Sequence, residues 1–175
     1  MQRHLRAHSQ GGQGDGRHYL AKNPAMTPKL KTVLEWFPDA RVINLVRNPL
    51  QAIPSYVSLM QFTYEVMNVP VPIEDLNAYV LEMARHWYDY ALVQLDGRST
   101  DRALTVRYND LVADPEGTVL EIYDSFGFPL STGFGRVLQA EAVGARQYRS
   151  RHEYSLEAFG LSRERILDEY DEVFQ

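Results

Sequence analysis

The segment Arg41–Ser55, with the sequence RVINLVRNPLQAIPS, decides the fold of this chain. Its apolar run from Val42 to Val46 is too short for a helix and stops at an Arg-Asn-Pro turn, so it predicts a buried β-strand. Asn48 is a favourable N-cap residue and Pro49 suits the first helical position, so we expect a helix to begin there. The segment therefore predicts a strand, a turn and a helix in direct succession.

This succession predicts an anion site at the carboxyl end of the strand. A helix that begins there presents unpaired N–H groups and the positive end of its dipole, which attract phosphate. Arg47 stands at the strand end, and Ser55 is expected about 9 Å along the helix at a rise of roughly 1.5 Å per residue. A surface arginine and a solvated serine are the alternative interpretation. Pro54 is expected to kink the helix just before Ser55.

Composition narrows the class of protein. The chain has 175 residues, of which 45% are hydrophobic, enough for one domain with a sizeable core. Its formal net charge of −5 argues against nucleic acid as a partner. The absence of cysteine excludes disulfides and thiolate metal ligands. Neither a membrane span of about 20 apolar residues nor a signal-peptide core is found, so we expect a soluble, cytoplasmic protein.

Hydrophobic periodicity predicts the remaining elements. We expect a short strand over residues 18–21, ending at Lys22, and an amphipathic helix over residues 28–37 that starts at the Thr27-Pro28 pair. With the strand after Arg41, they form a parallel crossover that places Lys22 and Arg47 at one edge of the sheet. The later elements are expected in this order: a helix over 74–95, a strand over 103–108, a helix capped by Asp114, a helix over 133–142, a loop over 144–154 and a helix opening at Ser162.

Two groups of side chains have both a structural and a functional interpretation. The helix over 74–95 carries an aromatic stripe, which we interpret as core rather than as a ligand platform. Its members are Tyr79, Trp87, Tyr88 and Tyr90. The loop over 144–154 concentrates positive charge in an acidic chain, with Arg149 and Arg151 near its centre, so its field favours an anion. Simple solvation of these arginines is the alternative.

Two motifs together resemble sulfotransferases of the bacterial type that use 3′-phosphoadenosine-5′-phosphosulfate. Arg47 at the strand end, with Ser55 eight residues later, resembles the family's 3′-phosphate-binding strand and helix, although Asn48 replaces the usual Asp. The sequence RYNDL at residues 107–111, followed by a helix that ends at Phe126–Pro129, resembles the family's RYEDL block. The segment after Arg149 also resembles the one that closes over the nucleotide.

The resemblance covers residues 17–175 and implies a single, partial sulfotransferase-like domain over residues 1–175. The implied fold is α/β, a parallel sheet with flanking helices as in P-loop NTPases. The implied reaction moves a sulfuryl group from 3′-phosphoadenosine-5′-phosphosulfate, as co-substrate and without a metal, to a hydroxyl or amine of a small molecule, lipid or glycan. We expect no nucleic-acid partner and no membrane span.

The resemblance also implies roles for single residues. Arg47 and Ser55 match the residues that bind the 3′-phosphate, and Tyr108 matches a tyrosine near the adenine, with a core tyrosine as the alternative. Lys22 loosely matches the lysine that neutralises charge at the reacting group, and is our candidate catalytic residue. Arg149 and Arg151 are candidates for a further phosphate contact. The general base stays unassigned, because the histidine that some members carry two residues after the lysine is a proline here.

One departure from the family pattern is large. Sulfotransferases begin with a strand and a loop that holds the 5′-phosphosulfate, and no counterpart precedes Lys22. We therefore expect an amino-terminally incomplete domain that shows no sulfuryl transfer by itself. Its exposed sheet edge favours a homo-oligomer. A non-catalytic nucleotide- or anion-binding module and a nucleotide kinase remnant are the competing interpretations.

Overall fold

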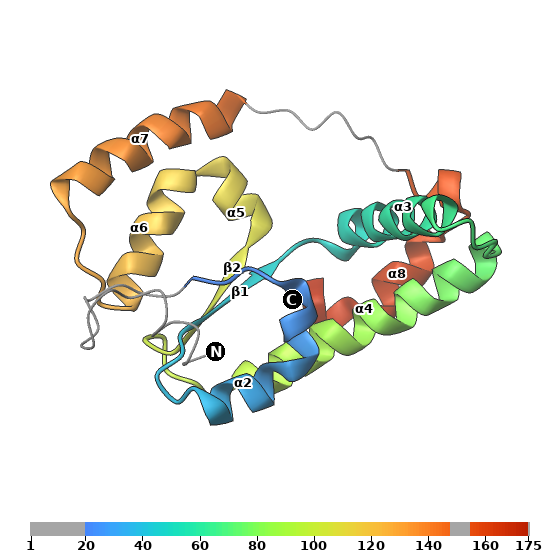
Figure 1. Ribbon diagram of the computed structural model, residues 1–175, viewed down its shortest axis with the longest axis horizontal. Helices are drawn as coiled ribbons and strands as arrows, with labels where there is room; N and C mark the ends of the chain where they lie inside the picture. The colour runs from blue at the N-terminus through green and yellow to red at the C-terminus, as the bar shows by residue number, and fades with distance from the viewer. Residues whose placement is uncertain (1–19, 148–154, 175) are drawn as a thin grey trace.

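A two-stranded parallel sheet lies at the centre of the fold, and helices flank it (Figure 1). The structure is a computed structural model that describes residues 20–147 and 155–174. Strand β1 (Val42–Val46) pairs with β2 (Ala103–Arg107), and the last pair in the register is Val46 with Arg107. Both strands therefore end at the same edge. The predicted α/β class with a parallel sheet and flanking helices is confirmed.

The predicted strand, turn and helix around Arg47 are also confirmed. Helix α3 (Pro49–Val66) begins two residues after Arg47, and the side chain of Asn48 caps it by accepting a hydrogen bond of 2.9 Å from the N–H of Leu50. The helix continues as one element through Pro54, whose side chain is buried. The turn is therefore held by a side-chain cap as well as by the strand that precedes it.

Replacing Asn48 with alanine should destabilise the protein by about 1 kcal/mol, within a range of roughly 0.5–2 kcal/mol for a lost N-cap. The reason is that the N–H of Leu50 loses its acceptor. Urea unfolding of the variant measures the loss, and Asn48→Asp is the matched control because aspartate caps equally well. An equal loss in both variants would show that the cap is not the cause.

Strand β1 is more exposed than the sequence predicts. The side chains of Ile43 and Leu45 are 41% and 48% exposed, so the expectation of a buried strand is wrong. Residues 20 and 21, from the expected strand over residues 18–21, are not in a strand, and the side chain of Leu20 is 86% exposed; residues 18 and 19 lie outside the described residues. The physical reason is that β2 alone pairs with β1 in the described part of the chain.

The helices form two groups on either side of the strands (Figure 1). One group contains α2 (Leu30–Trp36), α3, α4 (Ile73–Leu95) and α8 (Arg163–Glu169), and the other contains α5 (Tyr108–Ala113), α6 (Pro115–Ser125) and α7 (Thr132–Gln147). The main core lies in the first group, where α3 and α4 pack against the segment around α8. Its buried members are Ile53, Val57, Leu76, Val80, Leu81, Leu156, Leu161, Ile166 and Tyr170.

Most helix boundaries follow the sequence, and three differ. The start is wrong for the helix expected over 28–37, because Asn23 caps an earlier 3-10 helix, η1 (Pro24–Lys29), through a hydrogen bond from the N–H of Ala25. Helix α7 runs to Gln147, so residues 144–147 of the expected loop are helical. The helix expected to open at Ser162 is divided into α8 and α9 (Asp171–Phe174). Two short elements were not predicted, α5 and η2 (Glu157–Phe159).

Candidate anion-binding site

Arg47 and Tyr108 meet at the carboxyl edge of the sheet. Arg47 directly follows β1 and Tyr108 directly follows β2, and the parallel register brings the two strand ends side by side. The guanidinium carbon of Arg47 lies 5.2 Å from the centre of the Tyr108 ring, a cation–π distance. The structure therefore brings together two of the residues singled out in the sequence.

The guanidinium group of Arg47 has an unsatisfied donor. Its Nε is fully buried from solvent yet has no hydrogen-bond partner among the described residues. No described acidic side chain forms an ion pair with it either. A buried donor without an acceptor costs about 1–3 kcal/mol, and more when the group is charged. Because arginine donors match the oxygens of phosphate and sulfate, the guanidinium group of Arg47 is a candidate to hold one of these anions.

The start of helix α3 contributes less to such a site than the sequence predicts. The expectation of unpaired N–H groups there is wrong, because Pro49 has no N–H and the next three are paired. The N–H of Leu50 donates to the side chain of Asn48, and those of Gln51 and Ala52 donate to the carbonyl of Asn48, both at 2.9 Å. Binding of an anion at this edge therefore depends on side chains and on the helix dipole.

The other candidate residues are placed less closely together. Ser55 is half-buried in α3, and its hydroxyl makes no hydrogen bond with any residue of the described segments. Lys22 is exposed just before η1, and no strand ends at it. The expected crossover that places Lys22 at one edge of the sheet with Arg47 is therefore wrong, because β1 pairs with β2 in the described part of the chain. Arg149 and Arg151 lie outside the described residues.

Tyr88 is the residue at this site that the sequence interpretation missed. Its hydroxyl donates a hydrogen bond of 2.7 Å to the backbone carbonyl of Arg47. Burial raises the pKa of Tyr88 to about 12, and the nearby charge of Arg47 opposes the rise. The available signal was its spacing of seven residues from Leu81, which places a tyrosine on the buried face of α4, where its hydroxyl needs a partner.

The stability that Tyr88 contributes should be constant up to about pH 10 and should fall between pH 10 and pH 12. In that interval the unfolded chain has released the phenol proton and the folded chain still holds it, so the free energy of unfolding drops by up to about 1.4 kcal/mol per pH unit. Urea unfolding of wild type and Tyr88→Phe at neutral pH and across this interval measures the difference between them. A difference that does not change with pH would contradict the assignment.

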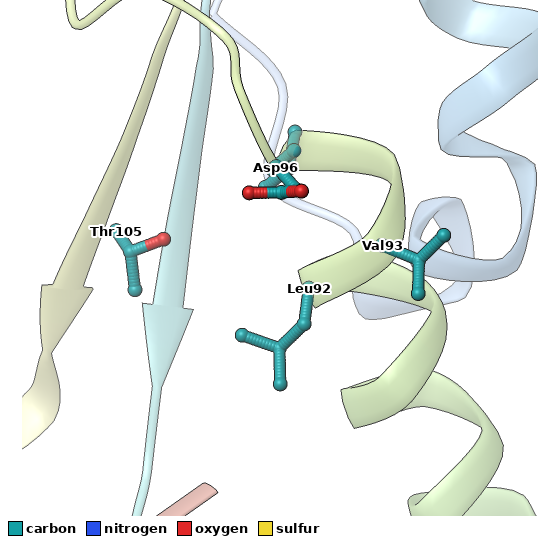
Figure 2. A pocket seen from close by; sticks show the side chains of 5 residues that line it. Leu92, Val93, Asp96 and Thr105 are labelled. Atoms are coloured by element: carbon teal, nitrogen blue, oxygen red, sulfur yellow. The ribbon is translucent and has the colours of Figure 1, made fainter. Parts of the chain in front are cut away.

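A hollow between α4 and the sheet lies apart from these residues. It has a volume of about 390 Å³ and is lined by Leu92, Val93, Leu95, Asp96 and Thr105. Leu92 points from α4 toward the strands, whereas Val93 points away (Figure 2).

Within residues 20–147 and 155–174, no group of three histidine, cysteine, aspartate or glutamate side chains could hold a metal ion. None of the described helices has the length and apolar character to cross a membrane.

Solved structures share this fold. Sulfotransferase STF9 from Mycobacterium avium superposes with a TM-score of 0.74 at 21% identity, over 86% of this chain and 39% of the other. Sulfotransferase STF1 from Mycobacterium tuberculosis H37Rv gives a TM-score of 0.64 at 26% identity, over 88% of this chain and 39% of the other.

Sequence relatives agree with the structural ones. The omega-hydroxy-beta-dihydromenaquinone-9 sulfotransferases Stf3 of Mycobacterium bovis and Mycobacterium tuberculosis are each 28% identical over 158 residues, which is 86% of this chain. The chain spans 38% of their length. A model of the sulfotransferase family matches residues 2–132, which is more than half of the chain. The chain therefore belongs to the sulfotransferase family.

Proposed function

We propose that this protein transfers a sulfuryl group from 3′-phosphoadenosine-5′-phosphosulfate to a hydroxyl or amine of a small molecule, lipid or glycan, as a cytoplasmic enzyme. The observation that carries the proposal is the buried Nε of Arg47, which has no partner among the described residues. A phosphate oxygen of the donor supplies that partner. Membership of the sulfotransferase family supports the proposal that the donor nucleotide supplies this phosphate.

The proposed reaction needs a charged, well-oriented site more than it needs covalent chemistry. The acceptor oxygen or nitrogen attacks the sulfur, a new bond to sulfur forms, and the bond from sulfur to the 5′-phosphate oxygen breaks. Adenosine 3′,5′-bisphosphate leaves, and the acceptor proton passes to a base that we do not assign. Positive charge near the leaving phosphate stabilises the transition state, as in phosphoryl transfer. We assign this role to Lys22.

We propose the nucleotide contacts from the family resemblance and, where the residues are described, from their positions. We assign the 3′-phosphate to Arg47 and Ser55, which lie at the end of β1 and in the early part of α3. We assign Tyr108 to the adenine side, because its ring already contacts the guanidinium of Arg47 and offers a flat apolar surface. Arg149 and Arg151 are proposed as further phosphate contacts.

The relatives favour one acceptor class within this proposal. The Stf3 proteins are named for an omega-hydroxylated dihydromenaquinone. We therefore place hydroxylated lipids first among the acceptors to be tested, ahead of phenols, amines and glycans.

Two measurements on the full chain test the proposal. Calorimetric titration compares adenosine 3′,5′-bisphosphate with ATP, and a radiolabelled sulfuryl donor is then incubated with lipid alcohols, phenols, amines and glycans. We expect the bisphosphate to bind more tightly than ATP, and labelled product would establish that the chain itself carries out the transfer. Tight binding without transfer to any acceptor would favour the nucleotide-binding module, and a preference for ATP would favour the kinase remnant.

Replacing Ser55 with alanine should weaken binding of adenosine 3′,5′-bisphosphate by about 0.5–1.5 kcal/mol, the range for one lost hydrogen bond. The hydroxyl has no hydrogen bond with the described residues, so its loss leaves the fold intact. Ser58→Ala, three residues later in the same helix and also half-buried, is the matched control. An equal effect of both variants on affinity would remove Ser55 from the site.

A further inference from the structure

The backbone at the end of β1 is held from a second element. The hydroxyl of Tyr88, in the middle of α4, donates its 2.7 Å hydrogen bond to the carbonyl of Arg47, which belongs to the peptide that joins Arg47 to Asn48. On the other side of this peptide, the side chain of Asn48 holds the N–H of Leu50. The peptide is therefore fixed by hydrogen bonds at its carbonyl and at the cap that follows it.

We propose that Tyr88 is a positioning residue for the 3′-phosphate site, which acts by holding this peptide so that Arg47 is aimed at the phosphate. The inference rests on the proposed function, since it takes Arg47 to bind the 3′-phosphate. Tyr88 itself contacts no substrate in this role. It acts through the backbone of Arg47.

The chemistry of arginine makes this orientation matter. A guanidinium group donates in one plane, and its hydrogen bonds weaken steeply as the donor angle closes. The Arg47 group is already confined on one side by the ring of Tyr108, and its Nε is buried. If this peptide rotates, the guanidinium group keeps all its N–H donors, but they point in a different direction. The hydrogen bonds to the phosphate are then weaker.

The C-terminal segment supports Tyr88 in turn. The ring of Tyr170 meets the ring of Tyr88 edge to face, with 5.9 Å between centroids and 83° between planes. Tyr170 is 2% exposed, and its hydroxyl donates to the backbone carbonyl of Leu81 in α4. The ring of Tyr88 thus packs against a residue that follows α8. The site at β1 is thereby linked to the packing of the C-terminal segment on α4.

The test measures how much the 3′-phosphate contributes to affinity. Wild type and Tyr88→Phe are titrated with adenosine 3′,5′-bisphosphate and with adenosine 5′-monophosphate, which lacks the 3′-phosphate. In Tyr88→Phe we expect roughly 3- to 10-fold weaker binding of the bisphosphate, as for one lost neutral hydrogen bond, and less than about a 2-fold change for the monophosphate. In an Arg47→Ala background, Tyr88→Phe should cause no further loss. Tyr79→Phe, on an exposed position of the same helix, is the matched control.

The outcomes separate the inference from the function on which it rests. If wild type binds both nucleotides equally, the 3′-phosphate site is refuted and the role of Tyr88 falls with it. If wild type prefers the bisphosphate but Tyr88→Phe keeps the full preference, only the role of Tyr88 is overturned. Equal weakening of both nucleotides would also overturn it, since that is the result of a general structural defect. Circular dichroism and thermal melting check that every variant is folded.

Discussion

Replacing Arg47 with alanine should weaken binding of adenosine 3′,5′-bisphosphate by about 1.5–3 kcal/mol, a loss of roughly 10- to 150-fold in affinity. The expected loss is large because the bond is charge-assisted and forms in a partly buried place. The Nε of Arg47 is shielded from water and has no acceptor among the described residues, so a phosphate oxygen competes with no internal partner. Isothermal titration of wild type and variant measures the change.

Arg41→Ala is the matched control for this prediction. Arg41 precedes β1 at the end opposite to Arg47, and its guanidinium carbon lies 4.5 Å from the centre of the Phe128 ring. Its removal takes the same charge from the protein, but at the other end of the strand. We expect nucleotide affinity to change by less than 2-fold, roughly, at moderate salt. Equal losses in the two variants would indicate a non-specific charge effect, and no loss in Arg47→Ala would remove the 3′-phosphate assignment.

Replacing Tyr170 with alanine should destabilise the protein by about 3–5 kcal/mol, the range for truncating a large aromatic side chain in a core. Tyr170 is one of the most buried residues of the core that joins α3, α4 and the C-terminal segment. Its truncation leaves a cavity next to Tyr88 and removes the hydroxyl that donates to the carbonyl of Leu81. Urea unfolding followed by circular dichroism measures the loss.

A loss of this size is a large part of the stability of a typical domain, so a milder series accompanies it. Tyr170→Phe keeps the ring and should lose about 1 kcal/mol through its hydroxyl alone. Ile166→Val, in the same core, should lose about 0.5–1.5 kcal/mol. If Tyr170→Ala unfolds no more readily than Tyr170→Phe, the aromatic ring does not support the core as described.

The local signals near Arg47 predicted the structure well because short-range chemistry determines them. Asn48 and Pro49 occupy the cap and first helical positions, as their side chains favour. Ser162 likewise caps α8 by accepting from the N–H of Arg165 at 3.2 Å. The parallel pairing of the strands before Arg47 and Tyr108 also agrees with the predicted fold. For the two helix caps, a few neighbouring residues carry the information.

Two features that the sequence did not predict depend on contacts between distant segments: the role of Tyr88 and the exposure of β1. The hydrogen bond from Tyr88 to Arg47 joins residues 41 positions apart, and its hydroxyl reaches the strand end only once α4 has packed against α3. The exposure of Ile43 and Leu45 depends on which elements cover β1, and an apolar run alone does not determine that. The helix start at Asn23 differs from these features, because its signal is local. Asn23 and Thr27 both precede a proline, and asparagine is the stronger N-cap residue.

Phosphorus NMR of bound adenosine 3′,5′-bisphosphate tests the central claim most directly, because it observes the 3′-phosphate separately from the 5′-phosphate. A phosphate monoester loses its second proton near pH 6, and a neighbouring arginine lowers that pKa by favouring the dianion. We predict that the pKa of the 3′-phosphate falls clearly below this value when the nucleotide is bound to wild type and returns toward it in Arg47→Ala. A 3′-phosphate that titrates in the wild-type complex as it does in free nucleotide would contradict the account.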